Sequence, residues 1–122
     1  MSWDRTTLAG VSARASEFAM QPAIERLVRR IVSQARPLRI ILFGSFARGD
    51  FNTSSDLDIC IIVASAEEWF ERSRRFRALT RFPGLDVEPH VYTAEEFAGM
   101  IERENPLALR IVAEGKILYE QQ

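Results

Sequence analysis

Residues 38–63 read LRIILFGSFARGDFNTSSDLDICIIV, and this stretch determines the architecture that we expect for the chain. Its two ends, residues 38–43 and 56–63, are rich in Ile and Leu, as buried strands are. Between them, Gly44-Ser45 ends the first strand, residues 46–48 form one helical turn that Gly49 ends, and residues 50–55 form a polar turn. We therefore expect two strands joined by a short helical turn.

Helices and strands are expected to alternate on both sides of this stretch. Ser65 and Thr93 each open a capping box, and Pro89 places a strand at a sheet edge or a bulge. The further predicted elements are helices that begin at residues 22, 65, 93 and 105 and strands over 85–92 and 116–119. The second of these helices is predicted to reach residue 81. This alternation predicts the α/β class.

The chain has 122 residues, which is the size of one domain; we expect an N-terminal arm over residues 1–21 and a single domain over 22–122. Its 16 Lys and Arg residues balance 17 Asp and Glu residues, so long nucleic acid is not an expected partner. No apolar run approaches the ~20 residues of a membrane span, and the first residues lack the layout of a signal peptide. Cys60 is the one cysteine, so no internal disulfide is possible. We expect a cytoplasmic protein that does not enter a membrane.

Two carboxylates begin the second strand. Side chains at positions i and i+2 of a strand face the same side, ~6.6 Å apart along the backbone, so Asp56 and Asp58 project together. Like charges at this separation repel each other. A divalent cation removes that conflict, and Mg²⁺ prefers one or two carboxylates together with water and substrate phosphate oxygens. Asp56 and Asp58 are therefore candidate metal ligands.

The turn before them is a candidate nucleotide-binding element. Gly44 allows the backbone to approach a ligand closely, and Ser45 stands where the short helical turn begins. The Ser45 hydroxyl adds a hydrogen-bond donor, and Arg48 can add a positive charge one turn later. A phosphate-binding turn beside metal-binding carboxylates is the combination that nucleotidyl transfer from a nucleoside triphosphate needs.

Gly44-Ser45, ten residues, and then Asp56-x-Asp58 resemble the signature of the DNA polymerase β nucleotidyltransferase superfamily, and the short chain resembles its minimal nucleotidyltransferase branch. The similarity to that branch covers about residues 22–120 and is closest over residues 40–49, 54–59 and 114–120. The resemblance implies a polymerase-β-like fold with a mixed three- to four-stranded sheet flanked by helices. It also implies a magnesium-dependent nucleotidyltransferase that uses ATP.

The resemblance implies a third carboxylate on the following strand, where relatives carry Asp. Counting back from the helix start at Thr93 lands on Glu88, and Asp86 lies two residues earlier on the same strand face. We favour Glu88 and keep Asp86 as the alternative. His90 shares this face, but a lone histidine near carboxylates is more typical of a surface or hydrogen-bonded residue than of a ligand.

The implied mechanism is two-metal phosphoryl transfer. Asp56 and Asp58 would hold two Mg²⁺ ions, typically ~4 Å apart. Glu88 would complete the site of the ion that activates the acceptor hydroxyl, or would take the acceptor proton itself. In-line positioning and charge stabilisation would provide most of the rate acceleration.

A catalytic core of this size has no evident acceptor-binding domain, so the resemblance implies a partner: a HEPN-type helical protein or a second copy of the chain. The leading hypothesis is an antitoxin that moves AMP from ATP to a hydroxyl, a tyrosine of a HEPN toxin. Two alternatives stay open. One is a nucleotidyltransferase for a small molecule such as an aminoglycoside, helped by a helical subunit. The other is a catalytically weak nucleotide-binding module that neutralises its partner by covering it.

Overall fold

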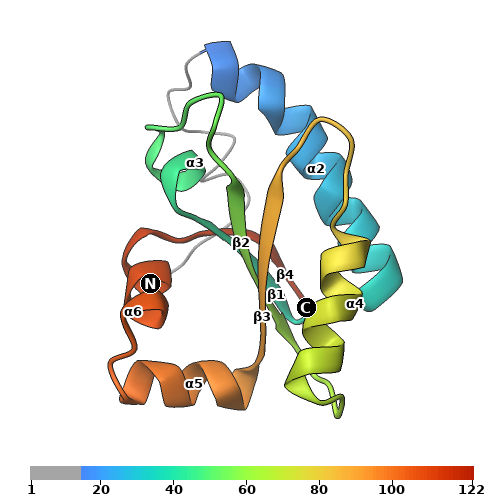
Figure 1. The fold of residues 1–122 in the computed structure, drawn as a ribbon, viewed down its shortest axis with the longest axis vertical. Coiled ribbons are helices and arrows are strands. Elements are labelled where there is room, and N and C mark those ends of the chain that lie inside the picture. The colour runs from blue at the N-terminus through green and yellow to red at the C-terminus, as the bar shows by residue number, and fades with distance from the viewer. Residues whose placement is uncertain (1–14) are drawn as a thin grey trace.

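The computed structural model describes residues 15–122, and its helices and strands alternate as predicted (Figure 1). The elements are, in order, α2 (Ala15–Ala35), β1 (Arg39–Phe43), α3 (Ser45–Arg48), β2 (Leu57–Val63), α4 (Trp69–Leu79), β3 (Val87–Thr93), α5 (Ala94–Glu102), α6 (Pro106–Glu114) and β4 (Lys116–Glu120). Within this range no helix has both the length and the apolar character needed to cross a lipid bilayer.

The four strands form one mixed sheet in the order β3-β2-β1-β4. Strand β1 runs antiparallel to both β2 and β4, whereas β2 and β3 are parallel. Strand β3 contains Pro89 and lies at an edge of the sheet, where a residue without a backbone N–H is tolerated. The α/β class and the mixed four-stranded sheet are therefore confirmed.

Alternation along the central strands sends side chains into two layers. Ile40 and Leu42 of β1 pack with α2 and α4 on one face of the sheet, whereas Ile41 and Phe43 lie on the other face with α6. Figure 1 shows α2 and α4 on one side of the strands and α5 and α6 on the other. Strand β2 divides in the same way, with Cys60 and Ile62 on the α5–α6 face. Asp58 has the same parity along β2 as Cys60, so it lies on the α5–α6 face.

Helix α2 begins earlier than the sequence predicted. It starts at Ala15, so residues 15–21 are helical rather than part of an arm, and Pro22 lies inside the helix. The Ala, Glu, Met and Gln residues among positions 15–21 are good helix formers, and they continue the helix past the single backbone hydrogen bond that the proline removes. The rest of the expected arm, residues 1–14, lies outside the described residues.

Helix α4 is shorter than the predicted helix over residues 65–81. It begins at Trp69, and the Ser65 hydroxyl does not cap it. That hydroxyl instead accepts a hydrogen bond from the backbone N–H of Glu67, which makes a local turn ahead of the helix. The second capping box is confirmed, because Thr93 and Glu96 exchange both of its hydrogen bonds at the start of α5.

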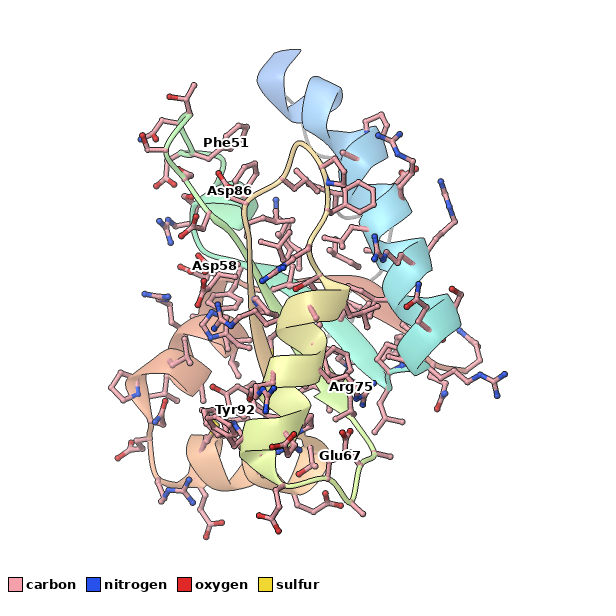
Figure 2. The ribbon with its side chains drawn as sticks, turned by 45° about the vertical axis from the view of Figure 1, so that its right-hand side comes forward. Phe51, Asp58, Glu67, Arg75, Asp86 and Tyr92 are labelled. Carbon is pink, nitrogen blue, oxygen red and sulfur yellow. The ribbon has the colours of Figure 1, made fainter. Side chains whose placement is uncertain are left out.

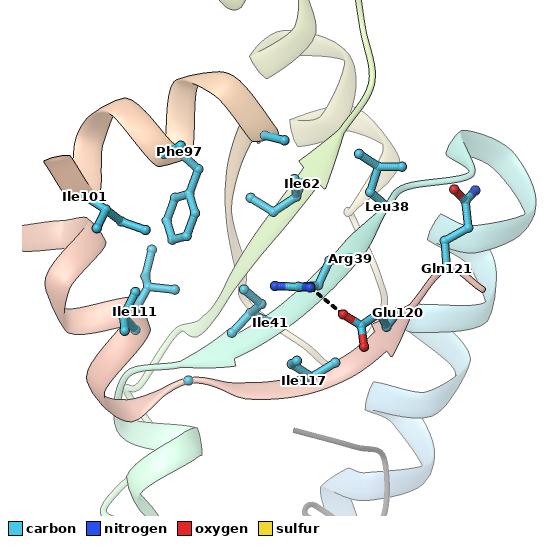
Figure 3. A pocket seen from close by; sticks show the side chains of 14 residues that line it. Leu38, Arg39, Ile41, Ile62, Phe97, Ile101, Ile111, Ile117, Glu120 and Gln121 are labelled. Atoms are coloured by element: carbon cyan, nitrogen blue, oxygen red, sulfur yellow. Dashed lines mark hydrogen bonds and ion pairs between the residues drawn. The ribbon is translucent and has the colours of Figure 1, made fainter. Parts of the chain in front are cut away.

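The α5–α6 face of the sheet is only partly covered. A hollow of about 840 Å³ lies between the sheet and these helices, and most of its lining is apolar. Figure 3 shows Phe97 of α5 and Ile111 of α6 beside Ile41 and Ile62 of the sheet, with the ion pair between Arg39 and Glu120 near β4. This hollow contains none of the predicted site residues.

An ion pair with one buried partner joins the two layers of helices. Arg72 of α4 is fully buried, and its Nη2 donates a hydrogen bond of 2.9 Å to Oε2 of Glu96 in α5. Its Nε and Nη1 have no hydrogen-bond partner among the described residues. Partial burial opposes ionisation of Glu96, but the hydrogen bonds from Arg72 and from the Thr93 backbone N–H hold its pKa below the usual range. Glu96 therefore provides the charge that balances a buried guanidinium.

Replacement of Glu96 by Ala should destabilise the fold by about 2 kcal/mol at neutral pH, less than for a fully buried pair because Glu96 is more than one third exposed. A carboxyl with a lowered folded-state pKa contributes stability above its unfolded-state pKa and loses it as the pH falls through the folded-state value. Urea unfolding measured from pH 7 to pH 3 should therefore show that acid lowers the free energy of unfolding less in Glu96→Ala than in the wild type. Glu95→Ala, an exposed neighbour in the same turn, is the control; an equal effect of both changes would contradict this role of Glu96.

Candidate active site

Gly44 packs directly against the carboxylate of Asp58. Phe43, at the end of β1, is the register partner of Asp58 in β2, and Gly44 follows with φ 78° and ψ −157°. Glycine is almost the only residue that adopts this conformation. A Cβ atom on Gly44 would lie 2.5 Å from Oδ2 of Asp58, so no larger residue can occupy the position without a shift. The absence of a side chain at Gly44 thus leaves room for the carboxylate beneath the turn.

The predicted carboxylates come from the neighbouring strands β2 and β3. Asp58 and Glu88 are register partners in parallel strands, so they lie side by side on the α5–α6 face. Asp56 is exposed and stands just before β2, and the Leu57 N–H beside it donates a 2.7 Å hydrogen bond to the Asp86 carbonyl oxygen. The structure therefore pairs Asp58 with Glu88 and brings Asp56 near the backbone of Asp86.

The two candidates for the third carboxylate lie in different surroundings. Asp86 lines an open hollow of about 650 Å³ together with Asp56, and Arg77 and Arg81 of the α4 side also line it. Glu88 does not line that hollow; its Oε1 is 3.9 Å from Nη2 of Arg77. In Figure 2, Asp58 and Asp86 lie toward the end of the molecule that carries Phe51, and Tyr92 lies toward the opposite end. Among residues 15–122, no three His, Cys, Asp or Glu side chains are close enough together to form a metal site by themselves.

Asp58 is the carboxylate with the most perturbed surroundings. Burial raises its pKa above the usual range, the charges of His90 and Arg110 oppose that rise, and Asp56 adds to it. His90 Nε2 lies 3.6 Å from Asp58 Oδ1, is buried, and has no hydrogen-bond partner in the described part of the chain. A partly buried carboxylate with a raised pKa is one whose ionised form a nearby cation would stabilise.

His90 and Cys60 lie close to this carboxylate on the same sheet face. The sequence pattern favoured a surface or hydrogen-bonded role for His90, whereas its ring is half-buried and meets the edge of Phe43 at a centroid distance of 5.2 Å. Cys60 is fully buried, and burial raises the pKa of its thiol to about 12. The thiol therefore stays neutral and acts as a small apolar residue, whereas His90 is a polar neighbour of the candidate site.

Glu114, which the sequence analysis did not select as a site residue, holds the predicted nucleotide-binding turn. Its Oε1 accepts a 2.9 Å hydrogen bond from the Gly44 N–H, and both of its oxygens accept from Arg48 Nη1, at 3.0 and 3.1 Å. Arg48 Nε also donates to Asp50 Oδ2 at 3.1 Å. The Gly44 N–H and much of the Arg48 guanidinium are thus engaged by carboxylates of the chain itself.

Ser45 differs from the two other predicted nucleotide-binding residues. It begins α3 and is partly exposed, and its carbonyl oxygen accepts the N–H groups of Gly49 and Asp50. Its hydroxyl has no hydrogen-bond partner among the residues that the structure describes. Of the three residues predicted to contact a nucleotide, Ser45 is therefore the one whose side chain no residue within 15–122 engages.

The sequence profile of a family described as nucleotidyltransferase domain matches residues 24–119. This chain belongs to that nucleotidyltransferase family. The match includes strands β2 and β3, which carry the candidate carboxylates, and the glycine-serine turn between β1 and β2.

Two curated relatives of the nucleotidyltransferase come from Methanocaldococcus jannaschii, and both are named as proposed protein adenylyltransferases. MJ0141 is 39% identical over 57 residues, which is 44% of this chain and 58% of the relative. MJ0604 is 46% identical over 44 residues, which is 34% of this chain and 44% of the relative. The matched segments thus cover about half the length of these relatives.

Several solved structures share the fold of this chain. One is a proposed nucleotidyltransferase from Sulfolobus solfataricus, with a TM-score of 0.59, 22% identity, and coverage of 85% of this chain and 83% of that one. Another is a toxin-antitoxin with AMP-PNP, with a TM-score of 0.52, 21% identity and coverage of 80% and 74%. A variant of the toxin-antitoxin MntA-HpeT has a TM-score of 0.54, 22% identity and coverage of 81% and 73%. These likenesses confirm that the nucleotidyltransferase has the expected fold.

Replacement of Gly44 by Ala should destabilise the nucleotidyltransferase by about 3 kcal/mol, from backbone strain at positive φ and from the clash with Asp58. Gly84 has a similar φ of 86°, but a Cβ atom there would meet no other atom within 4 Å, so Gly84→Ala should cost about 1 kcal/mol from strain alone. Chemical denaturation of both variants, repeated in an Asp58→Ala background, measures the difference. An equal loss of stability from Gly44→Ala and Gly84→Ala would show that Gly44 is not closely packed on the carboxylate. So would a loss from Gly44→Ala that stays the same in the Asp58→Ala background.

Proposed function

We propose that this chain is a magnesium-dependent nucleotidyltransferase that transfers AMP from ATP to a hydroxyl of a protein partner. The observation that supports this most strongly is the close packing of Gly44 on Asp58, because it joins the glycine-serine turn to the carboxylates in one place. In the proposed reaction the acceptor oxygen bonds to the α-phosphorus of ATP, the bond from that phosphorus to the bridging oxygen breaks, and pyrophosphate leaves.

The candidate carboxylates would suit a hard divalent cation together with phosphate oxygens of the nucleotide, because no three His, Cys, Asp or Glu side chains among residues 15–122 are close enough to hold a metal by themselves. Asp56, Asp58 and Glu88 offer only carboxylate oxygens, which are the ligands that Mg²⁺ prefers. Because Gly44 has no side chain, it does not cover the Asp58 carboxylate. When bound, Mg²⁺ would supply positive charge for the triphosphate and for the leaving pyrophosphate. Glu88 would complete the ligand set or take the proton of the acceptor hydroxyl, and its register pairing with Asp58 supports this choice over Asp86.

Gly44, Ser45 and Arg48 are proposed to contact the nucleotide. Ser45 would donate its hydroxyl to a phosphate oxygen. Gly44 would contribute chiefly by allowing the nucleotide to approach the backbone closely, since Glu114 already accepts the hydrogen bond of the Gly44 N–H. Arg48 would contribute through the part of its guanidinium that lies outside its pairs with Glu114 and Asp50.

The acceptor is proposed to be a tyrosine of a HEPN-type toxin, so that the chain acts as an antitoxin. Two lines of similarity support a protein acceptor: the curated relatives are named protein adenylyltransferases, and two structures of the same fold are toxin-antitoxins. We propose that this partner, either that toxin or a second copy of this chain, completes the acceptor site.

A second candidate is neutralisation of the partner by binding alone. It is favoured by the engagement of Gly44 and Arg48 with Glu114 and by Glu in place of Asp at position 88. Under this hypothesis nucleotide could bind but AMP would not be transferred. The two candidates differ in whether the partner becomes covalently modified.

With ATP and Mg²⁺, mass spectrometry should find the partner heavier by one AMP, and chelation of the metal should abolish the modification. Asp56→Ala combined with Asp58→Ala should reduce the rate on the order of a hundredfold or more, because the proposed metal ligands are lost. Glu88→Gln should have an effect of similar size, whereas Asp86→Asn should change the rate less than about tenfold.

Glu102→Ala removes an exposed carboxylate at the end of α5, remote in sequence from these residues, and serves as the control. A partner that stays unmodified in a stable complex would contradict AMP transfer and support neutralisation by binding. A large effect of Asp86→Asn with little effect of Glu88→Gln would assign the third carboxylate to Asp86.

A further inference from the structure

Arg110 of α6 is a basic residue close to the candidate site that the sequence analysis did not select. Its guanidinium carbon lies 5.6 Å from the centroid of the Phe43 ring. Phe43 immediately precedes Gly44 and is the register partner of Asp58. Burial raises the pKa of Asp58, and the positive charge of Arg110 is one of the effects that oppose this rise. The residue therefore lies beside both the turn and the carboxylate.

Arg110 has neighbours on two sides. On one side its guanidinium lies over the buried Phe43 ring, an arrangement that attracts a cation to an aromatic face. On the other side its Nε is 3.7 Å from Oε1 of Glu114, the same atom that accepts the Gly44 N–H. The helix that carries Arg110 is thereby connected to the Gly44 turn through Glu114.

Arg110 keeps its hydrogen-bonding capacity, in contrast to the nearby Arg48. Arg48 donates to two carboxylates, Glu114 and Asp50, at 3.0 to 3.1 Å. The 3.7 Å contact of Arg110 is too long for a hydrogen bond, and no other ion pair of Arg110 occurs within the described residues. Its side chain is about half exposed. With respect to residues 15–122, several N–H groups of Arg110 are therefore open to a ligand from solvent.

The charge around the site favours a side-chain cation for an anionic ligand, in addition to the proposed Mg²⁺. Asp56, Asp58 and Glu88 are all acidic, and Arg48 is balanced by two carboxylates. A nucleoside triphosphate that approaches this surface would be repelled unless positive charge is present. A planar guanidinium can bind phosphate oxygens with two parallel hydrogen bonds.

We propose that Arg110 binds the phosphate chain of the nucleotide, so that helix α6 supplies a cation to the nucleotide site and Arg48 serves mainly to hold the turn. This inference rests on the proposed function, because it needs a nucleoside triphosphate beside Gly44 and Asp58. It assigns a ligand-binding role to a helix that the Gly44-Ser45 and Asp56-x-Asp58 motif does not include.

The test is titration calorimetry with ATP and Mg²⁺, and separately with adenosine, in the absence of any acceptor. Arg110→Gln should weaken ATP binding by about tenfold or more, because hydrogen bonds to charged groups are lost, and should leave adenosine binding unchanged. Arg110→Lys should give an intermediate loss, because it keeps the charge without the planar pair of donors. Arg103→Gln, at an exposed position after α5, should bind ATP like the wild type.

The outcomes separate this inference from the proposed function. If the wild type binds ATP and Arg110→Gln binds it equally well, the role of Arg110 is wrong while the nucleotidyltransferase proposal stands. If the wild type does not bind ATP, both fail. If Arg110→Gln weakens ATP and adenosine equally, the residue supports the fold rather than the phosphates. Because the test compares the affinity for ATP with the affinity for adenosine in the same variant, it stays valid even if Arg110→Gln is less stable. Arg110→Lys is a milder change and provides a second variant.

Discussion

The contact between the α-carbon of Gly44 and the carboxylate of Asp58 is the constraint around which the candidate site is arranged. A Cβ atom at position 44 would lie 2.5 Å from Asp58 Oδ2, so the turn after β1 can cover the start of β2 only when it carries no side chain there. The antiparallel pairing of Phe43 with Asp58 sets this contact, and the parallel pairing of Asp58 with Glu88 adds the next strand. Three chain segments thus meet at one carboxylate.

Helix α6 completes this arrangement from the opposite end of the chain. Glu114 in its last turn accepts the Gly44 N–H and holds Arg48, and Gly115 then allows the chain to turn directly into β4. A Cβ atom on Gly115 would lie 2.4 Å from the Ile111 carbonyl oxygen and 2.6 Å from Ile41, so this junction is as tightly packed as the one at Gly44. The close fit places Arg110, one turn before Glu114, beside Phe43. A helix that the motif does not include therefore shapes the surface where a nucleotide is proposed to bind.

Local sequence patterns predicted the strands well, because buried strands leave a strong signal. The Ile- and Leu-rich segments became β1 and β2, Pro89 marked an edge strand, and Thr93 formed its capping box. The starts of α2 and α4 were wrong, because the rule for a proline in the first turn failed at Pro22 and Ser65 formed a local turn in place of a helix cap. Helix termini depend on such competing local hydrogen bonds more than strand interiors do.

The sequence motif selected candidate site residues that lie close together in the chain, and the family resemblance added Glu88 on the following strand. Asp56, Asp58 and the glycine-serine turn occur within fifteen residues, but Glu114 contacts Gly44 across 70 positions. No periodicity links residues that far apart, so the engagement of Arg48 and the place of Arg110 required the packing of α6 on β1. A further constraint that only the structure reveals is the position of His90 against Asp58.

The central claim is that Asp58, beneath Gly44, takes part in a site where a divalent cation and a nucleotide bind together. The most direct measurement is calorimetric titration of Mg²⁺ into the wild type and into Asp58→Asn, each with and without ATP. We expect ATP and Mg²⁺ to strengthen each other's binding in the wild type, and we expect this coupling to disappear in Asp58→Asn. Equal coupling in both proteins, or nucleotide binding that does not depend on the metal, would contradict it.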